Sequence, residues 1–276
     1  MVLLDNRTKL VTGRVAGYRP SYISKGKEIM KKIEQAEDTR PSIFVAQPSM
    51  GLVRVEHILN ITSWFLSGKY RMEYSPSVGN IPHDRARNIL ISRFLKTDFD
   101  YILFIDERTV GHVDTLDQLL AADKPVISAT SQTFKILSGN RKALVPTSFV
   151  AKEGKNKYRY HAGKGVEEVD VTNMACTLVK REVIENMARP WFKFEFLDED
   201  GTELMGEEFT FCKKVKEAGY KIYVDYDVLT HHFVYVDSSL VNNLVKTTHN
   251  NAVQKTFEAL KNPAPDVEER LDGLKI

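Results

Sequence analysis

Carboxylates stand at two places in the chain where they could do chemistry. Asp106 directly follows the apolar run 101–105, and Glu207 and Glu208 follow Gly206. A carboxylate at the end of a buried parallel strand lies at the sheet edge where open α/β folds bind ligands. Asp106 therefore faces a ligand crevice, the alternative being a helix-capping or loop aspartate. The paired glutamates suit proton transfer, and they also suit a helix start, where the dipole favours negative charge.

Arginine and histidine side chains supply candidate partners for an anion. Arg87 lies in a helix predicted from His83 to Leu95, and its guanidinium fork suits the geometry of a phosphate. The alternative is a surface arginine comparable with Arg85 and Arg93. His231 and His232 follow a predicted strand, and by themselves they are two histidines at a strand end near the surface.

Apolar runs predict the elements that position these residues. Ser42 to Ala46 reads as a buried parallel strand followed by a loop from Gln47 to Gly51, and residues 101–105 read as a central strand. Helices are predicted at Val53–Leu66, His83–Leu95 and Thr115–Ala122, with a further strand at Pro125–Ala129. This alternation predicts an α/β fold.

The rest of the chain is less regular. Residues Ser138 to Lys164 are basic and contain glycine, which predicts loops and an antiparallel excursion with a hairpin near Asn156. Further elements are predicted as a strand at Met174–Val179, helices at Arg181–Met187 and Glu207–Ala218, a strand at Lys221–Val224, and a long helix at Val236–Leu260.

The predicted domain organisation has three parts. Residues 1–41 form an N-terminal extension with a helix, residues 42–235 form one domain, and residues 236–276 form a C-terminal helix and tail. The tail has a Pro-rich hinge at 262–265 and a short amphipathic end. It could dock on a partner subunit, making a homo-oligomer, or cover the protomer's own core.

Composition narrows the class of function. The 276 residues carry 39 Lys and Arg against 37 Asp and Glu, so a net charge of +2 gives no global field for nucleic acid or an anionic membrane. Cys176 and Cys212 form no CxxC pattern, which argues against structural zinc and fits a reducing compartment. No run approaches the roughly 18 apolar residues of a membrane helix, and the first seven residues are unlike a signal peptide. We therefore expect a cytoplasmic protein without a transmembrane segment.

The order of the motifs resembles that of the GT-A glycosyltransferases. Ala86-Arg87-Asn88 followed by the strand into Asp106-Glu107-Arg108 is similar to that family's Ala-Arg-Asn helix and Asp-x-Asp strand. Gly206-Glu207-Glu208 resembles its Gly-Glu-Asp helix start, and His232, seven residues after Asp225, resembles its closing histidine. The match spans roughly residues 42 to 235 and implies a single GT-A-like domain, with a mostly parallel twisted sheet flanked by helices.

The resemblance implies metal-assisted transfer of a sugar, of hexosyltransferase type, from a UDP- or GDP-sugar to a carbohydrate or other hydroxyl acceptor. Glu208 would be the general base and Glu207 would orient the acceptor, with glutamate in place of the commoner aspartate. The implied sites are the nucleotide sugar at Gln47, Pro48, Ser49, Arg87, Asp106, Glu107 and Arg108, the acceptor at Trp191 and Phe192, and Mn²⁺ or Mg²⁺ at Asp106 and His232. Trp191 and Phe192 have the alternative of being plain core.

Arg108 departs from the family pattern, because it stands where the second carboxylate of Asp-x-Asp belongs. Three interpretations follow: Asp106 and His232 hold the ion with Glu107 or water, Arg108 is the counter-charge of the diphosphate, or the site is inactive. The alternative function is therefore a catalytically silent module that binds a sugar nucleotide or a glycan. A nucleotidyltransferase is disfavoured because no glycine-rich phosphate loop follows the first strand.

Overall fold

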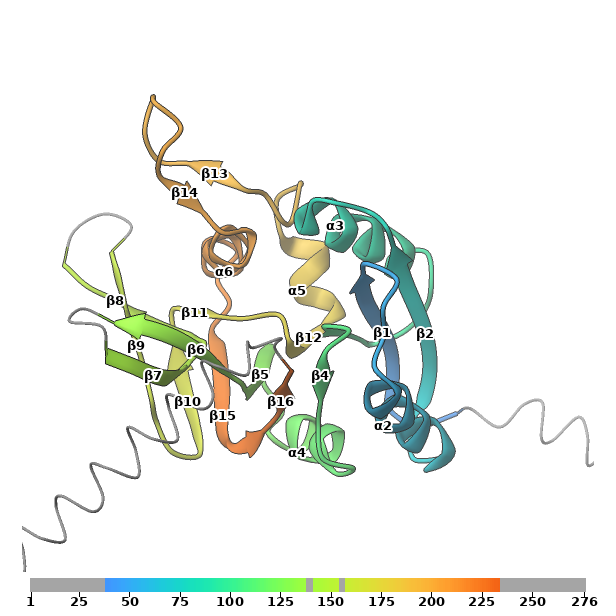
Figure 1. Cartoon of the computed structure of the whole chain (residues 1–276). Helices are drawn as coiled ribbons and strands as arrows, with labels where there is room; N and C mark the ends of the chain where they lie inside the picture. The colour runs from blue at the N-terminus through green and yellow to red at the C-terminus, as the bar shows by residue number, and fades with distance from the viewer. Residues whose placement is uncertain (1–37, 138–140, 154–156, 234–276) are drawn as a thin grey trace, which may run out of the picture. The chain divides into compact units, whose positions relative to one another are not determined.

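The computed structural model describes residues 38–137, 141–153 and 157–233 (Figure 1). The chain divides into two compact units, Met1–Pro41 and Ser42–Ile276, and the second holds the elements below. The helix expected in the N-terminal extension, the hairpin turn near Asn156 and the helix expected from Val236 lie outside the described residues. Within the described part of the chain, no helix has the length and apolar character needed to cross a membrane.

A seven-stranded sheet forms the centre of the second unit. Its order is β10 (Val166–Val169), β15 (Ile222–Leu229), β5 (Val126–Thr130), β12 (Cys176–Lys180), β3 (Tyr101–Ile105), β1 (Ser42–Ser49) and β2 (Arg71–Val78). Strand β1 runs parallel to β2 and β3, and β15 runs parallel to β5. Strand β12 is antiparallel to both β3 and β5, and β10 is antiparallel to β15.

Helices cover both faces of this sheet (Figure 1). They are α2 (Val55–Leu66), α3 (His83–Phe94), α4 (Thr115–Ala121), α5 (Arg181–Asn186) and α6 (Glu207–Glu217). One apolar cluster joins Phe44 and Phe104 to α3, α5 and α6, and the other joins Ile43 and Leu103 to α2 and α4. Alternate residues of one strand thus enter opposite layers, so residues 43–46 of β1 and 102–105 of β3 are all buried and apolar. The predicted α/β fold class, a sheet flanked by helices, is confirmed.

Short strands make up the rest of the described chain. Two form a hairpin, β6 (Gln132–Leu137) and β7 (Arg141–Pro146), and three form a small sheet, β8 (Ser148–Ala151), β9 (Tyr158–Tyr160) and β11 (Val171–Thr172). The others pair as β13 (Glu195–Phe196) with β14 (Leu204–Met205), and as β4 (Thr109–Val110) with β16 (His231–His232). The expected antiparallel excursion therefore exists.

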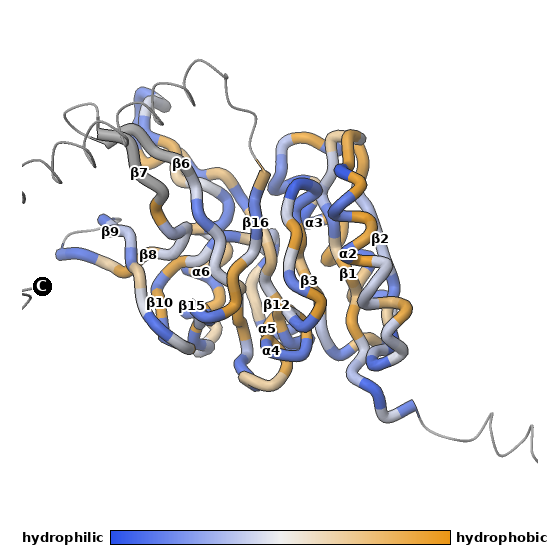
Figure 2. Tube along the Cα trace, turned by 60° about the horizontal axis from the view of Figure 1, so that its bottom comes forward, coloured by the Kyte–Doolittle hydropathy of each residue, from blue (hydrophilic) through white to orange (hydrophobic). Residues whose placement is uncertain are grey.

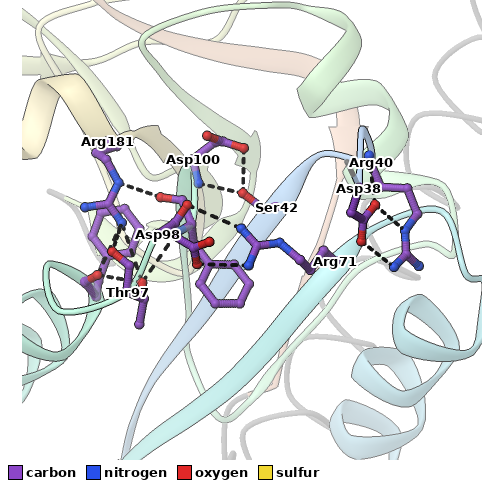
Figure 3. Close-up of polar contacts among 10 residues, drawn as sticks. Asp38, Arg40, Ser42, Arg71, Thr97, Asp98, Asp100 and Arg181 are labelled. Carbon is purple, nitrogen blue, oxygen red and sulfur yellow. Dashed lines mark hydrogen bonds and ion pairs between the residues drawn. The ribbon is translucent and has the colours of Figure 1, made fainter. Parts of the chain in front are cut away.

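Strand β2 was not predicted from the sequence, because residues 71–78 include several polar residues and Pro76. The strand lies at the edge of the sheet and pairs with β1 alone, and a proline is tolerated at an edge. Near the start of β1 and β3, polar contacts tie the strands together (Figure 3). Ser42 Oγ donates to Asp100 at 2.5 Å, and Arg71 pairs with Asp98 at 2.9 Å. These contacts lie at the strand ends opposite to Asp106.

Candidate active site

Asp106 and His232 are brought together by a two-stranded ribbon. Beyond β3 the chain turns, with the Thr109 amide donating to the Asp106 carbonyl at 2.9 Å, and enters β4. Strand β16 pairs with β4 so that His232 lies opposite Thr109. Asp106 and His232 line the same two cavities, although 126 positions of sequence separate them.

The two cavities differ in the residues that complete them. The first, of about 250 Å³, is also lined by Glu208 and by the aromatic residues Phe149, Tyr160 and Phe209; we call it the Glu208 cavity. The second, of about 260 Å³, is also lined by Pro48, Ser49, His83, Glu107 and Arg108; we call it the Arg108 cavity. Asp106 and His232 thus form a common wall between an acidic, aromatic space and a space with a permanent cation.

A buried arginine ties together three carboxylates beside this wall. Arg87 of α3 is 3% exposed and contacts Glu207 through Nη1, Asp106 through Nη2 at 3.2 Å, and Glu208 at 3.8 Å. Burial opposes the charge on Arg87, but the carboxylates of Asp106, Glu208 and Glu207 outweigh it and raise its pKa. The sequence predicted that Arg87 reaches a diphosphate; in the structure the guanidinium is buried and holds the acidic residues in place instead.

The two glutamates at the start of α6 have different surroundings. Glu207 is 4% exposed and faces Arg87, whereas Glu208 is 30% exposed and lines the Glu208 cavity. Gly206, the residue before the helix, leaves space for Glu208, since a Cβ there would lie 3.1 Å from Glu208 Oε2. Of the pair, Glu208 is the residue placed to meet a substrate.

Glu207 makes the stability of the protein depend on pH. Burial, together with the charge of Glu208, raises its pKa from 4.5 to about 7, and Arg87 opposes the rise. Between pH 4.5 and about pH 7, Glu207 keeps a proton in the folded chain that it has lost in the unfolded chain. The free energy of unfolding therefore falls as the pH rises through this range. We expect the melting temperature of wild type to fall, relative to that of Glu207→Gln, from about pH 5 to about pH 7.5. Melting curves that run parallel across this range would contradict the buried, protonated state.

Gln47, which the resemblance assigns to the nucleotide sugar, has buried protein partners in the structure. It is fully buried in β1, and its Oε1 lies 2.8 Å from His57 Nε2 and accepts from the Tyr74 hydroxyl at 2.5 Å. His57 Nδ1 lies 2.6 Å from the Thr109 carbonyl and donates to it. Burial lowers the pKa of His57, whereas the Thr109 carbonyl and the charges of Asp106 and Glu107 act to raise it. Gln47 is therefore part of a buried network that fixes β4.

Ser49 and Glu107, both assigned to the nucleotide sugar by the resemblance, are hydrogen-bonded to each other. The Ser49 hydroxyl donates to Glu107 Oε2 at 2.6 Å, and the Met50 amide donates to the same oxygen at 2.9 Å. Glu107 therefore braces the loop after β1. Both residues still line the Arg108 cavity, together with Pro48.

Trp191 and Phe192 are core residues, which is the alternative that the sequence left open for them. Phe192 stacks on Phe211 at 4.4 Å and 11°, and the Trp191 indole donates to the Ile184 carbonyl at 3.0 Å. Asn88 fixes this segment, because its Oδ1 accepts from the amides of Trp191 and Phe192, both at 3.1 Å. The neighbouring residues Arg87 and Asn88 thus have different partners. Arg87 contacts the carboxylates of Asp106, Glu207 and Glu208, and Asn88 binds the backbone of the segment with Trp191 and Phe192.

The sequence also left out residues that the fold adds to the site. Phe149, Tyr160 and Phe209 line the Glu208 cavity, and Thr147 and Asn173 line it as a hydrogen-bonded pair. Their positions belong to the antiparallel excursion and to the inner face of α6, with no motif spacing to reveal them. His83, which lines the Arg108 cavity, carried no signal beyond its place at the start of a helix.

The predicted metal ligands do not make a metal centre on their own. Asp106 and His232 supply one carboxylate and one imidazole, but no group of three His, Cys, Asp or Glu residues suited to a metal occurs among residues 38–137, 141–153 and 157–233. Asp106 also accepts from Arg87, and Arg108 lines the cavity beside it. Mn²⁺ or Mg²⁺ at this place stays a prediction, and no chemical step below depends on it.

A scan against protein-family models gives no match, and neither does a comparison with curated proteins. Among solved structures, A197 from STIV is similar over 71% of this chain and 87% of its own, at 21% identity and a TM-score of 0.46. GalNAc-T7 with UDP, GalNAc and Mn²⁺ matches over 73% of this chain and 45% of its own, at 10% identity and a TM-score of 0.41. S. aureus TarS 1–349 in complex with UDP-GlcNAc matches over 72% of this chain and 59% of its own, at 12% identity and a TM-score of 0.39. Because these TM-scores lie below 0.5, the chemistry has to be argued from the residues of this chain.

Proposed function

We propose that the protein is a glycosyltransferase that moves a sugar from a UDP- or GDP-sugar to a hydroxyl of a carbohydrate or another acceptor. The observation that carries the proposal is the pair of cavities with Asp106 and His232 as their common wall. A two-substrate transfer needs two adjoining spaces, one suited to a charged donor and one that places a base beside the acceptor.

The Arg108 cavity suits the donor. Arg108 supplies a guanidinium, which binds phosphate oxygens with charge-assisted hydrogen bonds, and His83 adds a second donor group. Ser49 and Glu107 hold the loop after β1 in one conformation, so this wall of the cavity is formed before a ligand arrives. Asp106, in the common wall, would meet the sugar of the donor between the two spaces.

The Glu208 cavity suits the acceptor. Phe149 lies between Tyr160, at 4.9 Å between ring centroids, and Phe209, at 5.1 Å. Aromatic faces give apolar area for the C–H face of a sugar, while the Thr147 and Asn173 side chains offer polar contacts to its hydroxyls. These rings replace Trp191 and Phe192 as the proposed acceptor platform.

The proposed step is an in-line displacement. The acceptor oxygen attacks the anomeric carbon, the bond from that carbon to the phosphate oxygen breaks, and the nucleoside diphosphate leaves with the electron pair. Glu208 takes the proton of the acceptor hydroxyl, and Arg108 compensates the charge on the leaving diphosphate. Arg87 and Glu207 position Glu208 and Asp106. A nucleophile that enters opposite to the leaving group inverts the anomeric configuration.

Release of nucleoside diphosphate tests this function. The full chain is incubated with UDP- and GDP-sugars, with and without a panel of carbohydrates, and UDP, GDP and glycosylated products are measured by chromatography and mass spectrometry. The proposal expects diphosphate release that rises with one class of acceptor and an equal amount of product. Binding of the nucleotide sugar without release in any mixture would instead support the silent binding module.

Arg108→Asp tests the source of the counter-charge. Placing a carboxylate against a diphosphate replaces attraction by repulsion, so we expect the affinity for UDP or GDP in metal-free buffer to fall by about tenfold or more. Calorimetry in the presence of a chelator measures this affinity, with Arg85→Asp as the control on the outer face of α3. A rise in Mn²⁺ affinity and in activity for Arg108→Asp would show instead that Asp106 and His232 hold an ion that Arg108 weakens.

A further inference from the structure

Helix α2 has a row of large apolar side chains that face outward. Val55, Ile58, Leu59, Phe65 and Leu66 are all exposed, Leu66 by 82%, and we call them the outer face of α2. The buried residues of the same helix, His57, Asn60, Ile61 and Trp64, lie on its other side against the sheet. Met50 and Leu52, in the loop before the helix, are exposed as well and extend the apolar surface.

This pattern is unusual for a helix that packs on a sheet. Such helices normally place charged or polar residues toward water, and scattered exposed apolar residues need no explanation. On α2, however, the apolar residues follow one another at helical spacing on the water side, and the tube of Figure 2 shows hydrophobic colour along the helix. A contiguous apolar patch of this kind marks a surface that another element covers.

The described chain ends beside this surface. Phe233 lies with its ring 4.2 Å from the guanidinium carbon of Arg54, the residue that immediately precedes α2. The Phe233 amide also donates to the Arg108 carbonyl at 3.0 Å, which fixes its position. The last described residue therefore lies at the N-terminal end of the outer face of α2.

The sequence that follows has an apolar stripe of its own. From Val236 to Leu260 apolar residues recur at helical spacing, at Leu240, Val241, Leu244, Val245, Ala252, Val253, Phe257 and Leu260. We propose that this segment packs as an amphipathic helix along the outer face of α2 of the same chain. Helix α2 has 12 residues and is about 18 Å long, so the segment is long enough to cover it.

Two physical arguments favour this occupant over a second chain or a membrane surface. A segment joined directly to Phe233 is held near α2 at about millimolar effective concentration, before any partner molecule competes. Docking also removes two apolar surfaces from water at once, at about 25 cal/mol per Å² buried. The docked segment would hold Phe233, and through it the neighbouring His232, which is a wall of both cavities. The inference itself stands whether or not the protein transfers sugars.

Disulfide trapping in the full chain tests the docking. Leu59→Cys is combined in turn with Val241→Cys, Leu244→Cys or Val245→Cys, under mild oxidation, with the native Cys176 and Cys212 buried. The expected result is an intramolecular disulfide in at least one pair, identified by peptide mass spectrometry. As a control, Lys213→Cys on α6 replaces Leu59→Cys in that pair, and the yield of disulfide should be about tenfold lower. Disulfides between chains would show that a second copy covers the face. No disulfide in any pair would overturn the docking.

A second measurement does not depend on the choice of cysteine positions. Leu59→Gln with Leu66→Gln removes apolar area from the outer face without touching the core, so the core should still unfold cooperatively, with stability lowered only by the lost docking. Trypsin cleavage after Lys246 and Lys255 should then become at least about fivefold faster, whereas Lys213→Gln should leave it unchanged. Equal cleavage rates in wild type and the double variant would contradict the proposal.

Discussion

Replacing Glu208 with glutamine is expected to lower sugar transfer by about 100-fold or more, while nucleotide-sugar affinity stays within about twofold. Glutamine keeps the shape of the side chain but cannot take the proton of the acceptor hydroxyl. The Glu208 side chain does not line the Arg108 cavity, where the donor is proposed to bind, so donor binding should be unchanged. Initial rates and calorimetry on the same preparations measure the two quantities separately.

Glu207→Gln is the matched control for this prediction. Its side chain is buried against Arg87, so the change should act on stability and its pH dependence more than on the proton transfer. Transfer rates of Glu208→Gln equal to those of wild type would show that the base lies elsewhere or that the reaction retains configuration. A larger loss of transfer in Glu207→Gln than in Glu208→Gln would exchange the two roles.

Arg87→Ala is expected to lower the free energy of unfolding by about 3–5 kcal/mol. The change leaves the carboxylates of Glu207, Asp106 and Glu208 without the cation that holds them, and Glu207 is buried. Removing one partner of a buried ion pair costs far more than the pair itself contributes, because the remaining carboxylates must stay charged without a partner or take up a proton. Denaturant unfolding followed by circular dichroism measures the loss.

Two further variants separate charge from packing in this prediction. Arg85 lies on the same helix and lines a surface groove with Asn88 and Lys193, so Arg85→Ala should change stability by about 0.5 kcal/mol or less. Arg87→Met with Glu207→Gln removes the buried charge on both sides and should recover part of the loss. If Arg87→Ala unfolds no more easily than Arg85→Ala, the carboxylates are not held by Arg87 as described.

The strands that build the ligand edge could be predicted because burial on both faces leaves a continuous apolar run. Residues 101–105 show this pattern, and the carboxylate that ends the run falls at the sheet edge for the same reason. The start of α6 was equally visible, since acids after a glycine suit the first turn of a helix. The sequence was therefore sufficient to predict Asp106 and Glu208 as candidate site residues.

The partners of these residues were not predictable from spacing. Arg87 meets Glu207 across 120 positions of sequence, and either a phosphate or a carboxylate satisfies the same guanidinium. Burial decides between them, and burial comes from Phe192 and the loop that Asn88 fixes. The direction of β12 was also hidden, because an apolar run looks the same in a parallel and an antiparallel strand.

A crystal structure of the full chain with a non-hydrolysable UDP- or GDP-sugar tests the central claim most directly. The account predicts that the diphosphate contacts Arg108 in the Arg108 cavity, and that the sugar lies at the common wall of Asp106 and His232 with its anomeric carbon toward Glu208. A nucleotide sugar bound elsewhere, such as in the groove between α3 and Lys193, or with its diphosphate in the Glu208 cavity, would contradict the account.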